Sequence, residues 1–262
     1  MVIPCIDMKI ILIGAGNLAT QLAVALQKKG MTPAYIYSRT RESAEQLSER
    51  LRDVPYSTDI SRVPTDGDLY IFAVKDSALL DLVSRMPSNR GLWVHTAGSM
   101  DMEVFAPYTA RYGVFYPMQT FSKERETDFD DIPIFVETNH TDDTERLQKL
   151  AGRLSTKVYE ATSEQRKYLH LAAVFACNFS NHLYALCDRI LSEHGLPFET
   201  MLPLIRETAA KAADMPPAQA QTGPAIRYDK NVIDKQMALL SDPTMRQIYD
   251  LMSRSIHETN KH

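Results

Sequence analysis

The feature that most constrains this chain is a glycine-rich turn between an apolar run and a helical pattern. The run Lys9–Ile13 leads into Gly14-Ala15-Gly16, and apolar residues at helical spacing then extend from Asn17 to Lys29. Gly30 follows in the position of a helix C-cap. A buried strand, a tight turn and a helix in this order predict the start of a parallel, helix-covered sheet.

The alternation of strand and helix patterns continues to about residue 160. The strands that we predict here are Ala34–Arg39, Asp68–Val74, Leu92–Gly98, Arg111–Pro117, Ile132–Thr138 and Lys157–Glu160. The predicted helices between them are 41–52, Ser77–Met86 and Asp142–Leu154. The hydrophobicity of the strands is continuous, which is typical of strands buried on both faces. The sequence therefore predicts an α/β fold, a doubly wound and mostly parallel Rossmann sheet.

Strand patterns stop after about Thr162. Three helical segments follow, predicted at Gln165–His194, Glu199–Asp214 and Asn231–Ser255, with proline-containing breaks between them. We therefore expect two domains, a Rossmann domain over residues 1–160 and a smaller all-helical domain over residues 161–262.

The glycine turn reads Gly-Ala-Gly-Asn-Leu-Ala, which fits the dinucleotide-binding pattern G-x-G-x-x-A. Gly14 permits the tight turn, Gly16 lets a pyrophosphate approach the backbone, and Ala19 allows close packing of helix on sheet. The free amides at the helix start, from Asn17 and Leu18, favour bound phosphate. A glycine bend without a ligand is the alternative, but the strand–turn–helix context favours a phosphate site.

The end of the second strand indicates which dinucleotide binds. An NAD site normally has a carboxylate there for the ribose hydroxyl, whereas this chain has Ser38-Arg39-Thr40-Arg41. A guanidinium can bind a 2′-phosphate bidentately and the hydroxyls can add hydrogen bonds. We therefore expect NADP(H) as the cofactor, the alternative being that Arg39 and Arg41 are only solvated charges at a helix start.

Other strand ends should reach the same edge of the sheet, where ligands of open α/β sheets bind. Val74 and Lys75 follow one strand and are expected near the adenosine and ribose. His95, Thr96 and Ser99 lie at the end of the next strand. The segment from Tyr116 to Ser122 is expected near the nicotinamide. A structural role and a catalytic role for His95 are equally supported.

One long predicted helix carries a polar stripe among apolar side chains. At 100° per residue, His170 and Asn181 lie about 20° apart and Asn178 about 80° from His170. Polar groups on such a helix either find partners in the core or face a cavity. We favour a cavity, in which His170 can donate a proton to a substrate as hydride arrives.

The composition excludes some classes of protein. The net charge of −4, from 29 basic and 33 acidic residues, argues against nucleic-acid binding. The three cysteines, Cys5, Cys177 and Cys187, have no metal-site spacing, so we expect reduced thiols, no metal and a cytoplasmic location. No apolar run has the length of a membrane span and no signal peptide is evident, so we expect no membrane association.

With these residues in view, the chain resembles the superfamily of pyrroline-5-carboxylate reductase, β-hydroxyacid dehydrogenases and deazaflavin-dependent NADP oxidoreductases. It is more similar to a branch of Rossmann-like NADP oxidoreductases with a helical C-terminal domain. The stretches that carry the resemblance are IGAGNLA, VHTAGS, GVFYPMQTFS, HLAAVFACNFSNHLY and TGPAIRYD.

The resemblance implies a nicotinamide-cofactor site at Gly14–Leu18, Ser38–Arg39, Ala73–Lys75 and His95–Ser99. It also implies a small-molecule substrate between the domains, near His170 and Asn178, and a homodimer formed through the helical domain. A deazaflavin or flavin as a second redox partner follows from analogy alone.

One departure from the family pattern bears on the chemistry. β-Hydroxyacid dehydrogenases have a helical lysine followed four residues later by asparagine, whereas here Leu171 follows Lys167 at that spacing. We predict an NADP(H)-dependent oxidoreductase that acts on a small carbonyl or imine. His170 would serve as acid and base, Asn178 would orient the substrate, and Ser99 or Thr120 would hydrogen-bond it. The alternative is a non-catalytic NADP-binding sensor or interaction protein.

Overall fold

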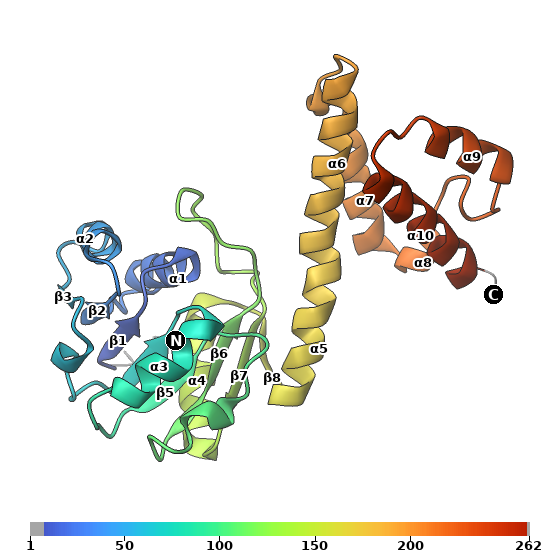
Figure 1. Ribbon diagram of the computed structural model, residues 1–262. Coiled ribbons are helices and arrows are strands. Elements are labelled where there is room, and N and C mark those ends of the chain that lie inside the picture. The colour runs from blue at the N-terminus through green and yellow to red at the C-terminus, as the bar shows by residue number, and fades with distance from the viewer. Residues whose placement is uncertain (1–7, 261–262) are drawn as a thin grey trace. The chain divides into compact units, whose positions relative to one another are not determined.

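The computed structural model describes residues 8–260 (Figure 1). The chain forms two compact units, and the division between them falls between Cys177 and Asn178. The predicted boundary near residue 160 stays a prediction. Among the described residues, no helix is both long and apolar enough to cross a membrane.

The first unit is built on one eight-stranded sheet with the order β3-β2-β1-β4-β5-β6-β7-β8. Its strands are β1 (Ile10–Ile13), β2 (Tyr35–Tyr37), β3 (Tyr56–Ser57), β4 (Leu69–Phe72), β5 (Leu92–His95), β6 (Tyr112–Pro117), β7 (Ile134–Thr138) and β8 (Val158–Glu160). All neighbouring strands pair in parallel except β6 and β7, which are antiparallel. The predicted doubly wound, mostly parallel sheet is confirmed, with the two-residue β3 as an unpredicted addition.

Alternate side chains of the central strands bury on opposite faces of this sheet. Ile10 and Leu12 belong to the apolar cluster that α1 (Asn17–Lys28), α2 (Arg41–Arg50) and α4 (Thr141–Leu154) cover. Ile11 and Ile13 belong to the cluster that α3 (Asp76–Arg85) covers on the other face, together with the 3₁₀ turns η1 (Ile60–Arg62) and η2 (Met102–Phe105). Burial on both faces explains the continuous hydrophobicity of the strands.

The helix after the sheet is not a single α-helix. It begins as α5 (Ser163–Ala173), opens into a π-helical turn over Val174–Phe179, and continues as α6 (Ser180–Glu193). The capping box of Thr162 and Gln165 starts α5. A π-turn advances less than 100° per residue, so the angles predicted between His170, Asn178 and Asn181 are wrong.

The described residues of the second unit form helices joined by turns and loops, with no strand among them. Besides α6 it contains η4 (Phe198–Met201), α7 (Leu202–Asp214), α8 (Pro217–Ala220), α9 (Lys230–Ala238) and α10 (Pro243–Thr259). The single helix predicted at Asn231–Ser255 is therefore two helices. Asp242 caps α10 by accepting hydrogen bonds from the amides of Thr244 and Met245, and Pro243 occupies the first position of the new helix.

Candidate functional site

The turn between β1 and α1 has the properties of a phosphate site. Gly14 has a φ of 128°, and a Cβ there would fall 2.2 Å from the carbonyl oxygen of Ala73, so only glycine fits. A Cβ on Gly16 would meet no atom within 4 Å, so the space beside its backbone is open. Gly16 is the N-cap of α1, no side chain caps that helix, and its first turn contains no acidic residue. These open amides suit an anion.

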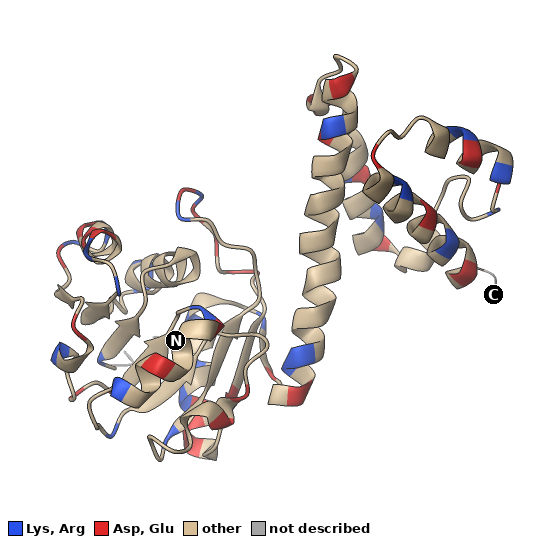
Figure 2. Cartoon of the chain, viewed as in Figure 1, with Lys and Arg blue, Asp and Glu red and all other residues tan. Residues whose placement is uncertain are grey.

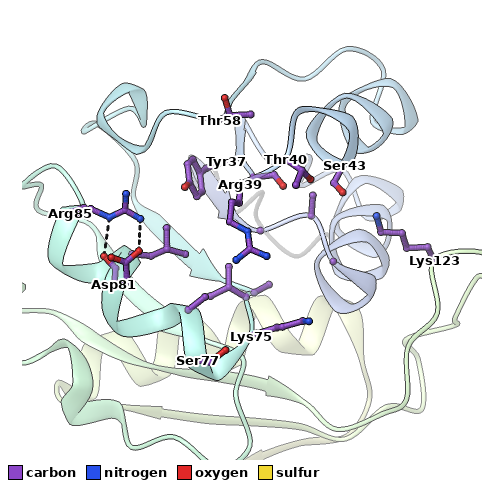
Figure 3. Close-up of a pocket in the computed structure, with 18 residues that line it drawn as sticks. Tyr37, Arg39, Thr40, Ser43, Thr58, Lys75, Ser77, Asp81, Arg85 and Lys123 are labelled. Atoms are coloured by element: carbon purple, nitrogen blue, oxygen red, sulfur yellow. Dashed lines mark hydrogen bonds and ion pairs between the residues drawn. The ribbon is translucent and has the colours of Figure 1, made fainter.

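A pocket of about 640 Å³ extends from this turn to the start of α2 and along α3 (Figure 3). Arg39, Lys75 and Lys123 line it, and none of the three side chains forms an ion pair with another described residue. The one carboxylate in the lining is Asp81, which already binds Arg85 at 2.5 Å. The pocket therefore offers unneutralised positive charge next to the open amides, as a phosphate-rich ligand requires.

Most of the predicted cofactor residues line this pocket. Those that do are Gly14, Gly16, Ser38, Arg39, Thr40, Ala73, Val74 and Lys75. Asn17, Leu18, His95 and Thr96 are not in its lining. The side chain of Asn17 instead donates a hydrogen bond to the carbonyl oxygen of Phe121, at 3.1 Å. The cofactor-binding roles of all these residues, inside and outside the lining, stay predictions.

A second group of polar side chains gathers around Gly98, at the carboxyl ends of β5 and β6. Tyr116 and His170 share a hydrogen bond of 3.3 Å between the hydroxyl and Nδ1. A Cβ on Gly98 would lie 2.7 Å from that Nδ1, so glycine permits this close approach. The hydroxyl of Ser99 donates to Asp76 at 2.6 Å, at the start of α3. The structure thus brings predicted Ser99 and His170 into one neighbourhood, within the first unit.

Tyr116 was predicted only as part of the segment near the nicotinamide, without a role. Burial raises the pKa of its hydroxyl, which keeps the group protonated at neutral pH. The hydroxyl can therefore donate to Nδ1 of a neutral His170, or accept from Nδ1–H when the ring is protonated. The signal in the sequence was its position at the end of a central strand.

His95 is completely buried and held by backbone groups at both ring nitrogens. Its Nδ1 accepts a hydrogen bond from the amide of Ala97 at 3.2 Å, and its Nε2 lies 3.3 Å from the carbonyl oxygen of Asp101. Burial, assisted by the nearby Arg166 cation, lowers its pKa to about 4. A neutral ring with Nε2–H donating satisfies both contacts, so His95 shapes the loop that carries Gly98 and Ser99.

Arg166 binds the loop that carries Gly98 and Ser99. The sequence patterns did not predict this role. It is fully buried and forms an ion pair with Glu137 at 2.7 Å. It also donates to the carbonyl oxygens of Ala97, at 3.3 Å, and of Met100. Arg166 lies on α5, one turn before His170, so this network fixes both the loop and the start of the helix.

Asn178 lies in the π-helical turn, is exposed, and begins the second unit. π-Turns within helices occur frequently at functional sites. The predicted role of Asn178 in orienting a substrate stays a prediction, as does the hydrogen bond expected from Thr120. The described residues contain no group of three or more His, Cys, Asp or Glu side chains that could hold a metal ion.

Two family models match the chain in succession. Residues 3–118 match a Rossmann-like domain, and residues 132–256 match a domain of unknown function, DUF2520. None of the curated proteins matches the chain.

Solved structures resemble the whole chain. A protein from Bacteroides fragilis, described as a "putative NADP oxidoreductase", is 52% identical with a TM-score of 0.90, over 96% of this chain and 98% of that one. A protein from Thermotoga maritima whose name gives no function is 23% identical with a TM-score of 0.77, over 95% and 99% of the two chains.

An imine reductase from Myxococcus stipitatus, in complex with NADP⁺, shares the fold at 16% identity and a TM-score of 0.69, over 97% and 95% of the two chains. The expected resemblance is thereby confirmed. The chain belongs to the same family as the Bacteroides fragilis protein, the NADP oxidoreductases in which a Rossmann-like domain precedes a DUF2520 domain.

Proposed function

We propose that this protein is an NADP(H)-dependent oxidoreductase that transfers a hydride between the nicotinamide and a small carbonyl or imine substrate. The observation that carries the proposal is the pocket beside the Gly14–Gly16 turn, which combines open helix amides with unpaired cations. The family relationship supports the class of reaction. A structurally similar protein is named an imine reductase, which supports a C=N substrate here. This support rests on the similarity of the fold alone.

The residues of the pocket fit NADP(H) in a defined order. The amides from Gly16 onward would bind the pyrophosphate, and Arg39 with the hydroxyls of Ser38 and Thr40 would bind the 2′-phosphate. Lys75, at the N-cap of α3, would face the ribose. No carboxylate among Ser38–Arg41 opposes a phosphate there.

When bound, NADPH supplies the hydride of the reaction. His170 would supply the proton that the carbonyl oxygen or imine nitrogen needs. Because Tyr116 engages Nδ1, the proton would leave from Nε2 while Nδ1–H of the imidazolium donates to the tyrosine oxygen. Ser99, whose hydroxyl donates to Asp76, would orient the substrate by accepting a hydrogen bond from one of its N–H or O–H groups.

The test is NADPH oxidation, followed at 340 nm, with a panel of small ketones and cyclic imines. We expect turnover with at least one substrate. We expect His170→Ala to lower kcat by about 100-fold or more while the Kd for NADPH stays unchanged, because only proton transfer is lost. His194→Ala, an exposed histidine on the C-cap of α6, is the matched control. Tight NADPH binding without turnover on any substrate would instead indicate a cofactor sensor.

The half-buried thiols support a cytoplasmic location, and the helical unit supports a homodimer. Cys177 and Cys187 form no disulfide, which suits the reducing cytoplasm, and Cys5 lies outside the described residues. Residues 168–187 contain no Lys, Arg, Asp or Glu, and Figure 2 shows this stretch without charged residues. Such an uncharged helix, with the exposed leucines of the second unit, supports a homodimer formed through that unit. A deazaflavin or flavin partner stays a prediction from analogy.

A further inference from the structure

A long segment connects β6 and β7, and its length exceeds what the sheet requires. The two strands are antiparallel neighbours, which a connection of about two to five residues can join. Here residues 118–133, named the strap below, lie between them and extend beside α1 instead (Figure 1). Long connections in compact domains usually have a function.

The strap is fastened to α1 by a buried amide. Gln21, 1% exposed, donates from Nε2 to the carbonyl oxygens of Ser122 at 2.6 Å and Lys123 at 3.3 Å, and its Oε1 accepts from the amide of Thr127 at 3.1 Å. Asn17, one residue after Gly16, holds the carbonyl oxygen of Phe121. A buried polar side chain with both ends bonded to one segment fixes the conformation of that segment.

The strap is also joined to α2. The guanidinium of Arg50 donates to the carbonyl oxygen of Lys123 at 2.9 Å. The backbone of Lys123 is therefore bonded from α1 and α2 together. Figure 3 shows the Lys123 side chain reaching into the pocket that also contains Thr40 and Ser43, at the start of α2.

Among the described residues, no acidic side chain of the strap forms an ion pair with Lys123. Glu126 pairs with Lys28, and Asp130 pairs with Lys29 at 3.1 Å, both at the far end of α1. Lys123 itself has no ion pair with a described residue, and it shares the pocket with the unpaired Arg39. An anion bound between these two cations would interact favourably with both.

We infer that Lys123 binds the 2′-phosphate of NADP(H), so that the strap, and not only the end of β2, determines the choice of cofactor. The inference rests on the proposed function. The 2′-phosphate is favoured over the pyrophosphate because Arg50, which anchors Lys123, and the neighbouring Ser43 both belong to α2, on the side of the 2′-phosphate. The pyrophosphate belongs at the Gly14–Gly16 turn.

The test is titration calorimetry of the full chain with NADP⁺ and with NAD⁺. We expect Lys123→Met to weaken NADP⁺ binding by about tenfold, the loss of one charge-assisted contact, and to change NAD⁺ binding by less than about twofold. Lys123→Arg should retain most of the preference. Arg125→Met, which removes an exposed cation from the same strap, is the matched control and should change neither affinity.

A second variant tests the strap itself. Gln21→Leu removes the three hydrogen bonds that position Lys123, so it should also lower the preference for NADP⁺. Because the two residues act through one contact, the double variant should lose no more than Lys123→Met alone. Thermal unfolding of each variant confirms that the chain remains folded.

The results separate the inference from the proposed function. Tight, NADP⁺-selective binding by the wild-type chain with an unchanged preference in Lys123→Met overturns the inference and leaves the function standing. An equal loss of both affinities in Lys123→Met places the lysine at the pyrophosphate and also overturns the inference. A wild-type chain that binds NADP⁺ no more tightly than NAD⁺ would contradict both the inference and the proposed function.

Discussion

At the scale of single residues, the loop after β5 is set by two buried groups that act on backbone atoms. His95 is bonded to backbone groups of residues 97 and 101, and Arg166 reaches the carbonyl oxygens of Ala97 and Met100. Burial and the nearby Arg166 cation both favour the neutral form of the His95 ring. Protonation of His95 would place a second positive charge beside Arg166 in a desolvated site.

This leads to a prediction about stability and pH. The folded pKa of His95 is about 4 and the unfolded value is 6.5, so the unfolded chain binds the extra proton between these values. The contribution of the neutral His95 ring to the free energy of unfolding is fully present above pH 6.5. It is lost as the pH falls towards 4, and the loss reaches about 3 kcal/mol. We expect the urea midpoint, followed by the fluorescence of the single, buried Trp93, to fall through this range.

His95→Gln is the comparison for that experiment. Its amide can donate and accept a hydrogen bond without titrating, so the pH dependence between 4 and 6.5 should shrink markedly in this variant. An identical slope in the wild type and the variant would assign the effect to other groups.

At the scale of elements, the turn between β1 and α1 contains two glycines, on either side of Ala15, of which one is needed for folding and the other for binding. Gly14 has a positive φ and its missing Cβ leaves room for the backbone of Ala73, whereas Gly16 faces open space at φ −80°. Gly14 is thus required by the chain itself. Gly16 is required only if a ligand occupies the open space.

The two alanine substitutions should therefore differ. Gly14→Ala should lower the free energy of unfolding by about 2 kcal/mol or more, because both the conformation and the contact are unfavourable. Gly16→Ala should leave the thermal unfolding midpoint unchanged within a few degrees and weaken NADP⁺ binding by about tenfold or more. Calorimetry and thermal unfolding of both variants provide the measurements. Unaltered NADP⁺ affinity in Gly16→Ala would contradict the phosphate site.

The elements also show what could be predicted from the sequence. The strands and the glycine turn were predictable because burial on two faces and a tight turn leave local patterns of residue types. The π-turn at Val174–Phe179 was not, since its residues have the same apolar composition as an α-helix. Arg166 was missed because an arginine on a helix usually contacts solvent, and its partner Glu137 is distant in the sequence. The attachment of the strap to α1 could not be predicted for the same reason, because Gln21 and Ser122 are distant in the sequence and contact each other only in the folded chain.

At the scale of the whole molecule, the two units differ in how much apolar surface they bury. The first has two extensive clusters of buried residues on the faces of its sheet. Within residues 178–260, the buried hydrophobic side chains are Ala225, Ile233 and Met245 alone. Leu204 on α7 and Leu251 on α10 are each 62% exposed. A helical unit with so small a core gains stability by covering these side chains, and a second copy of the chain can do so.

We therefore expect the wild-type chain to sediment as a dimer in analytical ultracentrifugation. Replacing Leu204 and Leu251 together by glutamate should weaken the dimer by more than about tenfold, because each carboxylate would be desolvated in an apolar interface. Leu80→Glu is the matched control, since Leu80 is a comparably exposed leucine, at 56%, on α3 of the first unit. It should leave the dimer intact. A monomeric wild type, or a dimer that Leu80→Glu weakens equally, would contradict assembly through the helical unit. A dimer that only the paired substitution weakens would place Leu204 and Leu251 in the interface.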